Sequence, residues 1–195
     1  VAAAEFGLPI APGTLRNLKK CPIGDRNWTD ESRELFIRLL ASGPALLNVW
    51  EDIDFIDVPG KLIPEWLGVR NRPSASAAHR YTIDRHMVEV VTRLGRETPS
   101  GGRYDDRHYE ALLLAGILHD IGKRPGVANH AAEGARHATV VVERMGFDRD
   151  IVRWVTLLVR EHLTLSEFTT GRNPNDPNVG DDLAGRLDHN PVLDR

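Results

Sequence analysis

The feature that most constrains this chain is an apolar run over residues 112–118 that ends in His119 and Asp120. The run, LLLAGIL, holds no polar side chain, so we expect it to be buried. An imidazole and a carboxylate that come off a buried segment cost free energy unless a partner uses them. A divalent cation is the most economical partner, because one neutral imidazole and one carboxylate can share it as ligands. The run therefore predicts a metal site at the end of a buried segment.

The composition describes one ordinary globular domain. The chain has 195 residues, 41% of them apolar and 27% charged. A net charge of −3 argues against nucleic acid or a membrane surface as a partner. No apolar run is long enough to cross a membrane, and the N-terminus does not resemble a signal peptide. The single Cys21 excludes an internal disulfide and fits a reducing compartment, so we expect a cytoplasmic protein.

The spacing of apolar residues is helical almost throughout, and strand alternation is nearly absent. One helix is expected between a start signal at 29–31 and a Gly-Pro stop at 42–44. Turns around a short packed piece are expected over 58–66, and loops over 71–78, 96–103 and 125–129. The remaining predicted helices cover residues 14–20, 45–56, 82–94, 105–120, 131–145, 148–165 and 181–187. The predicted fold class is all-α.

Three histidines fall on inward positions of three different predicted helices. His86 lies on the apolar face of 82–94, His162 on that of 148–165, and His119 ends the buried run. A single such histidine is more often a hydrogen-bonded core residue than a ligand. Three of them, with Asp120 beside one, favour a shared metal at the centre of a helical bundle, which satisfies all of the imidazoles together.

Other polar residues flank this centre. His130 follows the His-Asp pair closely enough to fold back over it, or else it is an exposed loop histidine near a helix start. His79 precedes the His86 helix, where it would cap, orient or bind substrate. Lys123 either places a cation by a substrate phosphate or stabilises a helix C-terminus. We assign His79, with Arg80 beside it, to substrate contact. The remaining histidines have no apolar company and are expected on the surface: His108, His137 and His189.

Imidazole and carboxylate ligands without a thiolate disfavour a structural zinc site. They suit Mn, Mg, Fe or a catalytic Zn. Such an ion activates water near neutral pH and stabilises negative charge on a phosphoryl oxygen. Metal-assisted hydrolysis of a phosphoester is therefore the predicted reaction class.

These residues resemble the HD metal-dependent phosphohydrolase superfamily. More specific strings resemble the central HD domain of the bifunctional PII uridylyltransferase/uridylyl-removing enzymes. They are HRYTIDRH at 79–86, LHDIGK at 118–123, NH at 129–130, EHL at 161–163 and, upstream, GKLIPEW at 60–66. The resemblance implies an HD-domain helical bundle with a metal site in its core. It divides the chain into a lead-in over 1–28, a helical approach segment over 29–78 and the HD domain over 79–195.

The resemblance also implies an activity, which is removal of a nucleotidyl group, UMP or AMP, from a tyrosine of the PII nitrogen-signalling protein. Asp120 and Lys123 then carry over as catalytic residues, with Lys123 contacting the phosphate or the leaving group. Glutamine is implied as an effector, and nucleotidyltransferase and ACT domains as neighbours in the full-length protein. The residues that carry over as metal ligands are His86, His119, Asp120, His130 and His162.

Two departures from the family pattern affect this expectation. Asn173 stands where relatives tend to have an Asp, and the chain stops at Arg195, before the late helix that carries a further Asp ligand. We therefore expect an excised central domain that lacks one ligand. Two alternatives stay open: hydrolysis of a small nucleotide such as (p)ppGpp, and a regulatory, glutamine-sensing module without catalysis.

Overall fold

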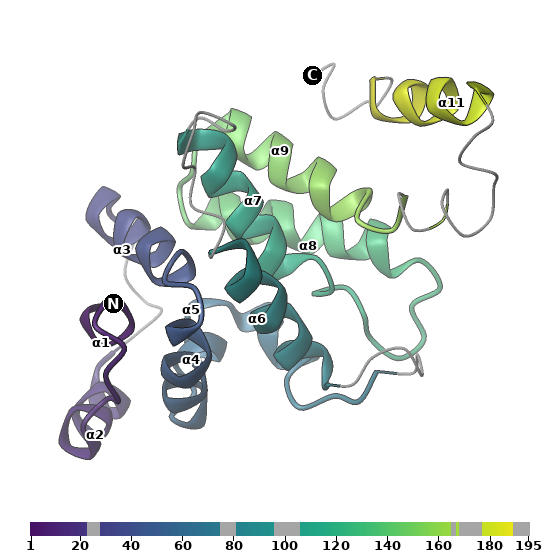
Figure 1. The fold of residues 1–195 in the computed structure, drawn as a ribbon. Helices are drawn as coiled ribbons and strands as arrows, with labels where there is room; N and C mark the ends of the chain where they lie inside the picture. The colour runs from purple at the N-terminus through teal and green to yellow at the C-terminus, as the bar shows by residue number, and fades with distance from the viewer. Residues whose placement is uncertain (23–27, 75–80, 96–105, 165–166, 168–176, 189–195) are drawn as a thin grey trace.

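The computed structural model describes residues 1–22, 28–74, 81–95, 106–164, 167 and 177–188. Every regular element in these ranges is a helix, and their only β-type pairing is an isolated bridge between Pro73 and Thr82. The all-α prediction is confirmed, and the arrangement fits an HD-domain bundle (Figure 1). The helices are α1 Ala2–Glu5, α2 Pro12–Lys20, α3 Asp30–Leu40, α4 Ala45–Phe55, α5 Val58–Leu62, η1 Pro64–Gly68, α6 Ile83–Leu94, α7 Asp106–Leu118, α8 His130–Arg144, α9 Arg149–Arg160 and α11 Pro177–Asp188.

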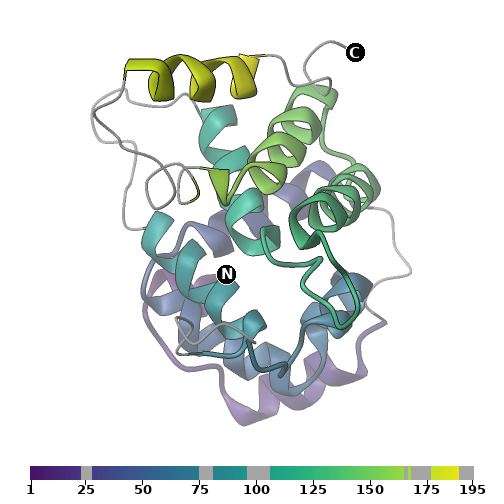
Figure 2. The ribbon, with the colours of Figure 1, turned by 90° about the vertical axis from the view of Figure 1, so that its right-hand side faces the viewer.

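Helix α7 forms the centre of the bundle. It packs against α3, α6, α8 and α9. Figure 1 shows α1 to α3 on one side of it and the α8–α9 pair on the other, and Figure 2 shows the bundle from the α8–α9 side. Leu113, Leu114, Ile117 and Leu118 are inaccessible to solvent, as the apolar run predicted. Because α7 is surrounded, whatever follows its last residue is delivered into the interior of the bundle.

Local signals set several helix ends close to the predicted bounds. The Thr29 hydroxyl accepts a hydrogen bond from the N–H of Ser32 and caps α3, and the carboxylate of Asp148 caps α9. Gly146, in the left-handed region at φ +78°, follows the end of α8. These caps satisfy backbone groups that the helix ends leave unpaired.

Elsewhere the elements differ from the predicted ones. The segment expected as turns over 58–66 is the short helices α5 and η1, because Trp66 and Ile63 are buried against the rest of the bundle. Helix α7 ends at Leu118 rather than at 120, and α9 ends at Arg160 rather than near 165. The N-terminal lead-in is also partly helical, since α1 packs on α4 and buries Ala4.

Candidate metal centre

Four helices bring the candidate ligands to one point. His86 comes from the first turns of α6, and His130 is the first residue of α8. His119 with Asp120 follows the end of α7, and His162 follows the end of α9. The imidazole rings form a chain, with centroids 5.1 Å apart for His86 and His119 and 5.3 Å apart for His119 and His162. Residues up to 76 positions apart in the sequence thus share one site.

The ligand atoms fall into two groups that share Asp120. His86, His119 and Asp120 form the first, and Asp120, His130 and His162 form the second. Within each group the ligand atoms all lie within 4.8 Å of one another. Asp120 is only 2% exposed, so its carboxylate stands at the junction of two places where a cation fits.

Two of the imidazoles are oriented by the same backbone contact. Nδ1 of His119 lies 2.9 Å from the carbonyl oxygen of Gly116, and Nδ1 of His162 lies 2.7 Å from that of Val159. A carbonyl can only accept, so each Nδ1 carries the hydrogen in the neutral ring and each Nε2 presents a lone pair. Hydrogen bonding of the outer nitrogen to a carbonyl is how proteins usually orient a metal-binding histidine.

The inner nitrogens face the carboxylate without a hydrogen bond. Nε2 of His162 lies 3.6 Å from Oδ1 of Asp120, and Nε2 of His119 lies 3.7 Å from Oδ2. Nε2 of His162 is buried and has no hydrogen-bond partner in the described part of the chain. An imidazole lone pair and a carboxylate oxygen that face each other across this gap repel unless a cation lies between them. The donor set therefore fits a divalent metal.

The protonation states suit metal binding. Burial lowers the pKa of His119 to about 4, so the ring is neutral near pH 7. Burial alone would raise the pKa of Asp120, but His162, His119 and the Lys123 ammonium outweigh it and hold that pKa below its ordinary value. Both groups are thus in their ligand forms without any need to lose a proton.

Lys123 lies at the edge of the centre. Its Nζ donates to Oδ2 of Asp120 at 3.2 Å, and it lines the same cavity as the histidines. That cavity has a volume of about 860 Å³ and an apolar wall of Val90, Leu94, Leu112 and Leu158. This volume is within the range of small-molecule sites. The wall was not identified from the sequence, because its residues only looked like ordinary helix-face positions.

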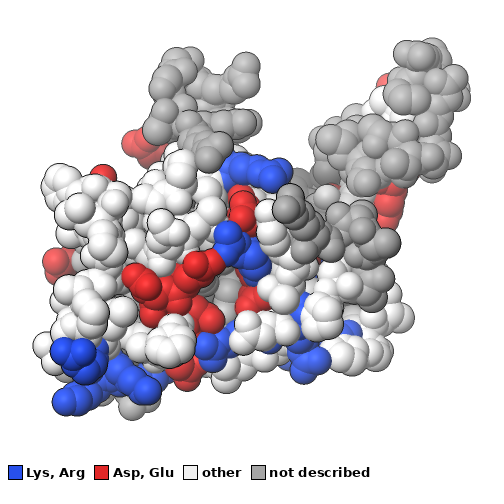
Figure 3. All heavy atoms as spheres, turned by 60° about the horizontal axis from the view of Figure 1, so that its bottom comes forward, with Lys and Arg blue, Asp and Glu red and all other residues white. Residues whose placement is uncertain are grey.

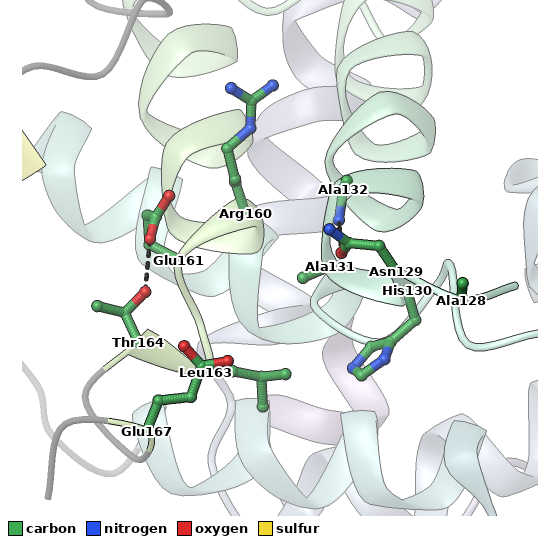
Figure 4. Close-up of a pocket in the computed structure, with 10 residues that line it drawn as sticks. All are labelled: Ala128, Asn129, His130, Ala131, Ala132, Arg160, Glu161, Leu163, Thr164 and Glu167. Atoms are coloured by element: carbon green, nitrogen blue, oxygen red, sulfur yellow. Dashed lines mark hydrogen bonds between the residues drawn. The ribbon is translucent and has the colours of Figure 1, made fainter. Parts of the chain in front are cut away.

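A second cavity, of about 590 Å³, adjoins the first and shares His130 and Leu163 with it. Figure 4 shows the start of α8 on one side of it, with Arg160, Glu161 and Thr164 on the other. The hydroxyl of Thr164 donates to Glu161. His130 therefore stands between the two cavities.

The other predicted site residues have different outcomes. His79, Arg80 and His189 lie outside the described residues, as does Asn173. Neither His108 nor His137 is in a ligand group. His108 is exposed, as predicted, whereas His137, which was also predicted on the surface, has a side chain only 13% exposed because it packs beside Glu133. His137 pairs with Glu133, and His108 stacks on Trp154 with ring centroids 4.2 Å apart. The backbone carbonyls that orient His119 and His162 were not predicted, since a sequence carries no signal for them.

The all-helical bundle and its histidine-aspartate centre place the chain among helical proteins with a candidate metal site. Comparison with known proteins makes this more specific, because relatives of the chain are named bifunctional uridylyltransferase/uridylyl-removing enzyme. The protein of that name from Streptomyces coelicolor is 38% identical over 179 residues, which cover 90% of this chain and 20% of that protein. The one from Mycobacterium tuberculosis is 34% identical over 193 residues, covering 98% and 23%. The one from Corynebacterium glutamicum is 29% identical over 194 residues, covering 98% and 27%.

The chain is therefore a homologue of one segment of the bifunctional uridylyltransferase/uridylyl-removing enzymes, and the resemblance is confirmed. It spans about a fifth of the length of the first two relatives. No family model matches the chain, and no solved structure matches it. Among the described helices, none combines the length and the apolar character that crossing a membrane requires.

Proposed function

We propose that this chain is a metal-dependent phosphodiesterase that removes a nucleotidyl group, UMP or AMP, from a tyrosine of the PII signalling protein. One observation carries the proposal: two groups of imidazole ligands share the buried carboxylate of Asp120. The names of the relatives supply the substrate class, since a uridylyl-removing enzyme cleaves the phosphoester bond that holds a uridylyl group.

In this proposal the centre holds one or two divalent ions through His86, His119, Asp120, His130 and His162. When bound, such an ion supplies an activated water and a positive charge beside the phosphoryl oxygens. The water oxygen forms a bond to phosphorus, and the bond from phosphorus to the tyrosine oxygen breaks. The attacking water loses a proton and the departing phenolate gains one, so the products are the nucleoside monophosphate and the unmodified tyrosine side chain of PII.

The residues around the centre have separate tasks. The backbone carbonyls of Gly116 and Val159 hold the rings of His119 and His162 in place. The Lys123 ammonium, already beside Asp120, contacts a phosphoryl oxygen or the departing phenolate. The apolar wall of the large cavity receives the ring of the tyrosine or of the base.

The test is release of nucleotide from PII that carries UMP or AMP on its tyrosine. The purified chain is loaded in turn with Mn, Mg, Fe and Zn, and free nucleotide is measured by chromatography. We expect metal-dependent release that is lost in His119→Ala. His137→Ala is the matched control, because His137 lies outside both ligand groups and should leave the activity unchanged.

Other outcomes would contradict the proposal. If modified PII stays intact while (p)ppGpp is cleaved in a metal-dependent reaction, the chain is a small-nucleotide hydrolase. Cleavage of neither, together with heat on titration with glutamine, would make it a regulatory module. The neighbouring nucleotidyltransferase and ACT domains, and glutamine as effector, remain part of the proposal for the full-length protein.

A further inference from the structure

The two cavities at the metal centre have walls of different chemistry. In the large cavity, which we call the apolar cavity, the polar lining residues are the five candidate ligands and Lys123, and all the other lining residues are apolar. In the cavity of about 590 Å³, which we call the polar cavity, polar residues extend beyond the centre. They are Asn129, Arg160, Glu161, Thr164 and Glu167. Because the two cavities meet at His130 and Leu163, a substrate held at the centre can extend into both.

The proposed substrate, on which this assignment rests, is a phosphodiester with two unlike halves. A tyrosine ring is apolar except for the oxygen that is bonded to phosphorus, so it fits an apolar wall. A nucleoside carries hydroxyl groups on its ribose and further polar atoms on its base. Against an apolar wall these groups would lose their hydrogen bonds to water without gaining others. The two halves therefore suit different cavities.

We propose that the polar cavity holds the ribose and the base of the nucleotidyl group, and that the apolar cavity holds the tyrosine ring. Both volumes, about 590 and 860 Å³, lie within the range of small-molecule sites. Of the two cavities, Lys123 lines only the apolar one. Its ammonium therefore lies on the side where the phenolate departs, and it stabilises the negative charge that develops on the tyrosine oxygen.

Two charged residues at the end of α9 suit the nucleoside. Arg160 lines the polar cavity and makes no ion pair or hydrogen bond with any residue that the structure describes. Its guanidinium thus has donors for the acceptor atoms of a base. The carboxylate of Glu161 accepts from the Thr164 hydroxyl and has further acceptor sites, which suit the ribose hydroxyls. Figure 4 shows both residues across the cavity from Asn129 at the start of α8.

The surface away from the centre offers an anionic substrate less. Figure 3 shows the face that brings α2 and α4 forward, where acidic side chains gather toward the middle with basic ones among them. The chain as a whole carries a net charge of −3. A nucleotide gains no attraction from such a face, so its recognition depends on the cavities that adjoin the metal centre.

The test measures binding by calorimetry in the full 195-residue chain loaded with Mn. The probes are inorganic phosphate, phenyl phosphate and a nucleotide, UMP and AMP in turn. All carry a phosphoryl group, so differences in affinity report on the phenyl ring or on the nucleoside. We expect phenyl phosphate and at least one nucleotide to bind more tightly than phosphate.

One variant in each cavity should weaken one probe only. Arg160→Met keeps the apolar stem, and it should lower the nucleotide affinity about tenfold while the other two affinities stay unchanged. Leu158→Ser alters a partly exposed residue of the apolar cavity, and it should lower only the affinity for phenyl phosphate, by about fivefold. The matched control is Arg149→Met at the exposed start of α9, which should change none of the three.

Several outcomes would overturn the assignment. They are an unchanged nucleotide affinity in Arg160→Met, a nucleotide affinity that falls in Leu158→Ser instead, and an equal loss of all three affinities in Arg160→Met. Circular dichroism establishes that each variant is folded, and Glu161→Gln, which keeps an acceptor for Thr164, gives an independent answer if Arg160→Met is not. Release of nucleotide from modified PII judges the proposed function separately. Release without the selective loss refutes only the cavity assignment, whereas selective loss without release refutes only the hydrolase.

Discussion

The candidate metal centre and a surface cluster both combine carboxylates with histidine and basic side chains, but in different arrangements. The surface cluster consists of Glu65 on η1 with Glu133, Arg136, His137 and Arg144 on α8. Its carboxylates are paired by guanidinium groups, at 2.6 Å for Arg136 and Glu133 and at 2.7 Å for Arg144 and Glu65. Asp120 accepts from the Lys123 ammonium at 3.2 Å, but its other neighbours are imidazole nitrogens at 3.6 to 3.7 Å. A guanidinium occupies a carboxylate's acceptor sites, whereas imidazole lone pairs leave a place that only a cation can fill.

The pKa values follow the same division. Arg136 lowers the pKa of Glu133 to about 2 through a direct hydrogen bond. In the metal centre, burial is the largest effect on His119 and lowers its pKa to about 4. The surface pair is thus stabilised as ions, while the buried ring is kept neutral. Five predictions test this contrast, from the largest expected effect to the smallest.

Asp120→Asn should have the largest effect, because both ligand groups contain Asp120. We expect metal affinity to fall by more than about a hundredfold, beyond the 10- to 100-fold losses typical of residues that only support a ligand. Nucleotidyl-removing activity should be lost with it. Elemental analysis after dialysis against Mn measures the metal. Metal content equal to that of the unaltered chain would show that Asp120 is not a ligand.

Acid should destabilise the metal-free chain through His119. Its folded pKa of about 4 lies below the ordinary value of 6.5, so the unfolded chain binds more protons between these values. The free energy of unfolding is therefore highest above pH 6.5, and it falls by up to about 3 kcal/mol as the pH drops to 4. Urea unfolding in EDTA across this range measures it. His119→Gln should flatten the dependence, and an unchanged slope in that variant would contradict the assignment.

Gly122→Ala should separate the turn after Asp120 from the start of α8. An added Cβ would lie 2.2 Å from the amide nitrogen of Gly134 and 2.4 Å from the carbonyl oxygen of His130. Overpacking of this kind costs roughly 1–3 kcal/mol, and it should also weaken metal binding by displacing His130. Thermal unfolding and calorimetry measure the two effects. The control is Gly180→Ala, where the Cβ meets nothing, and equal results for the two variants would refute the close approach.

Lys123→Met should separate catalysis from metal binding. The apolar stem is kept, so we expect metal content to remain while the rate of nucleotide release falls about tenfold, as loss of one hydrogen bond to a charged group predicts. Loss of metal in this variant would instead make Lys123 a support for Asp120.

Glu133→Gln should have the smallest effect. It removes an exposed ion pair with Arg136, and such pairs contribute little to stability. We expect no measurable change in Tm or in metal content. A clear drop in metal content would show that the surface cluster and the metal centre are coupled rather than independent.

The sequence alone determined the fold class and most of the helices. Apolar spacing and capping residues such as Thr29 and Asp148 are local properties, so they can be read without knowing what packs against them. The same spacing put His86 on an inward helix face, and the apolar run before His119 predicted α7 as the buried element. The convergence of the histidines could be expected because side chains on the inward faces of packed helices point into the same core.

Tertiary structure decided the geometry on which the function depends. His119 and His162 stand in turns just beyond their helices, where each ring reaches a carbonyl three residues back. The approach of Gly122 to Gly134 likewise depends on the packing of separate segments. So does the burial of the unpaired side-chain atoms of Trp50 and Asp84. Such contacts depend on how whole helices pack, and no local pattern of residue types encodes the distance between two backbones.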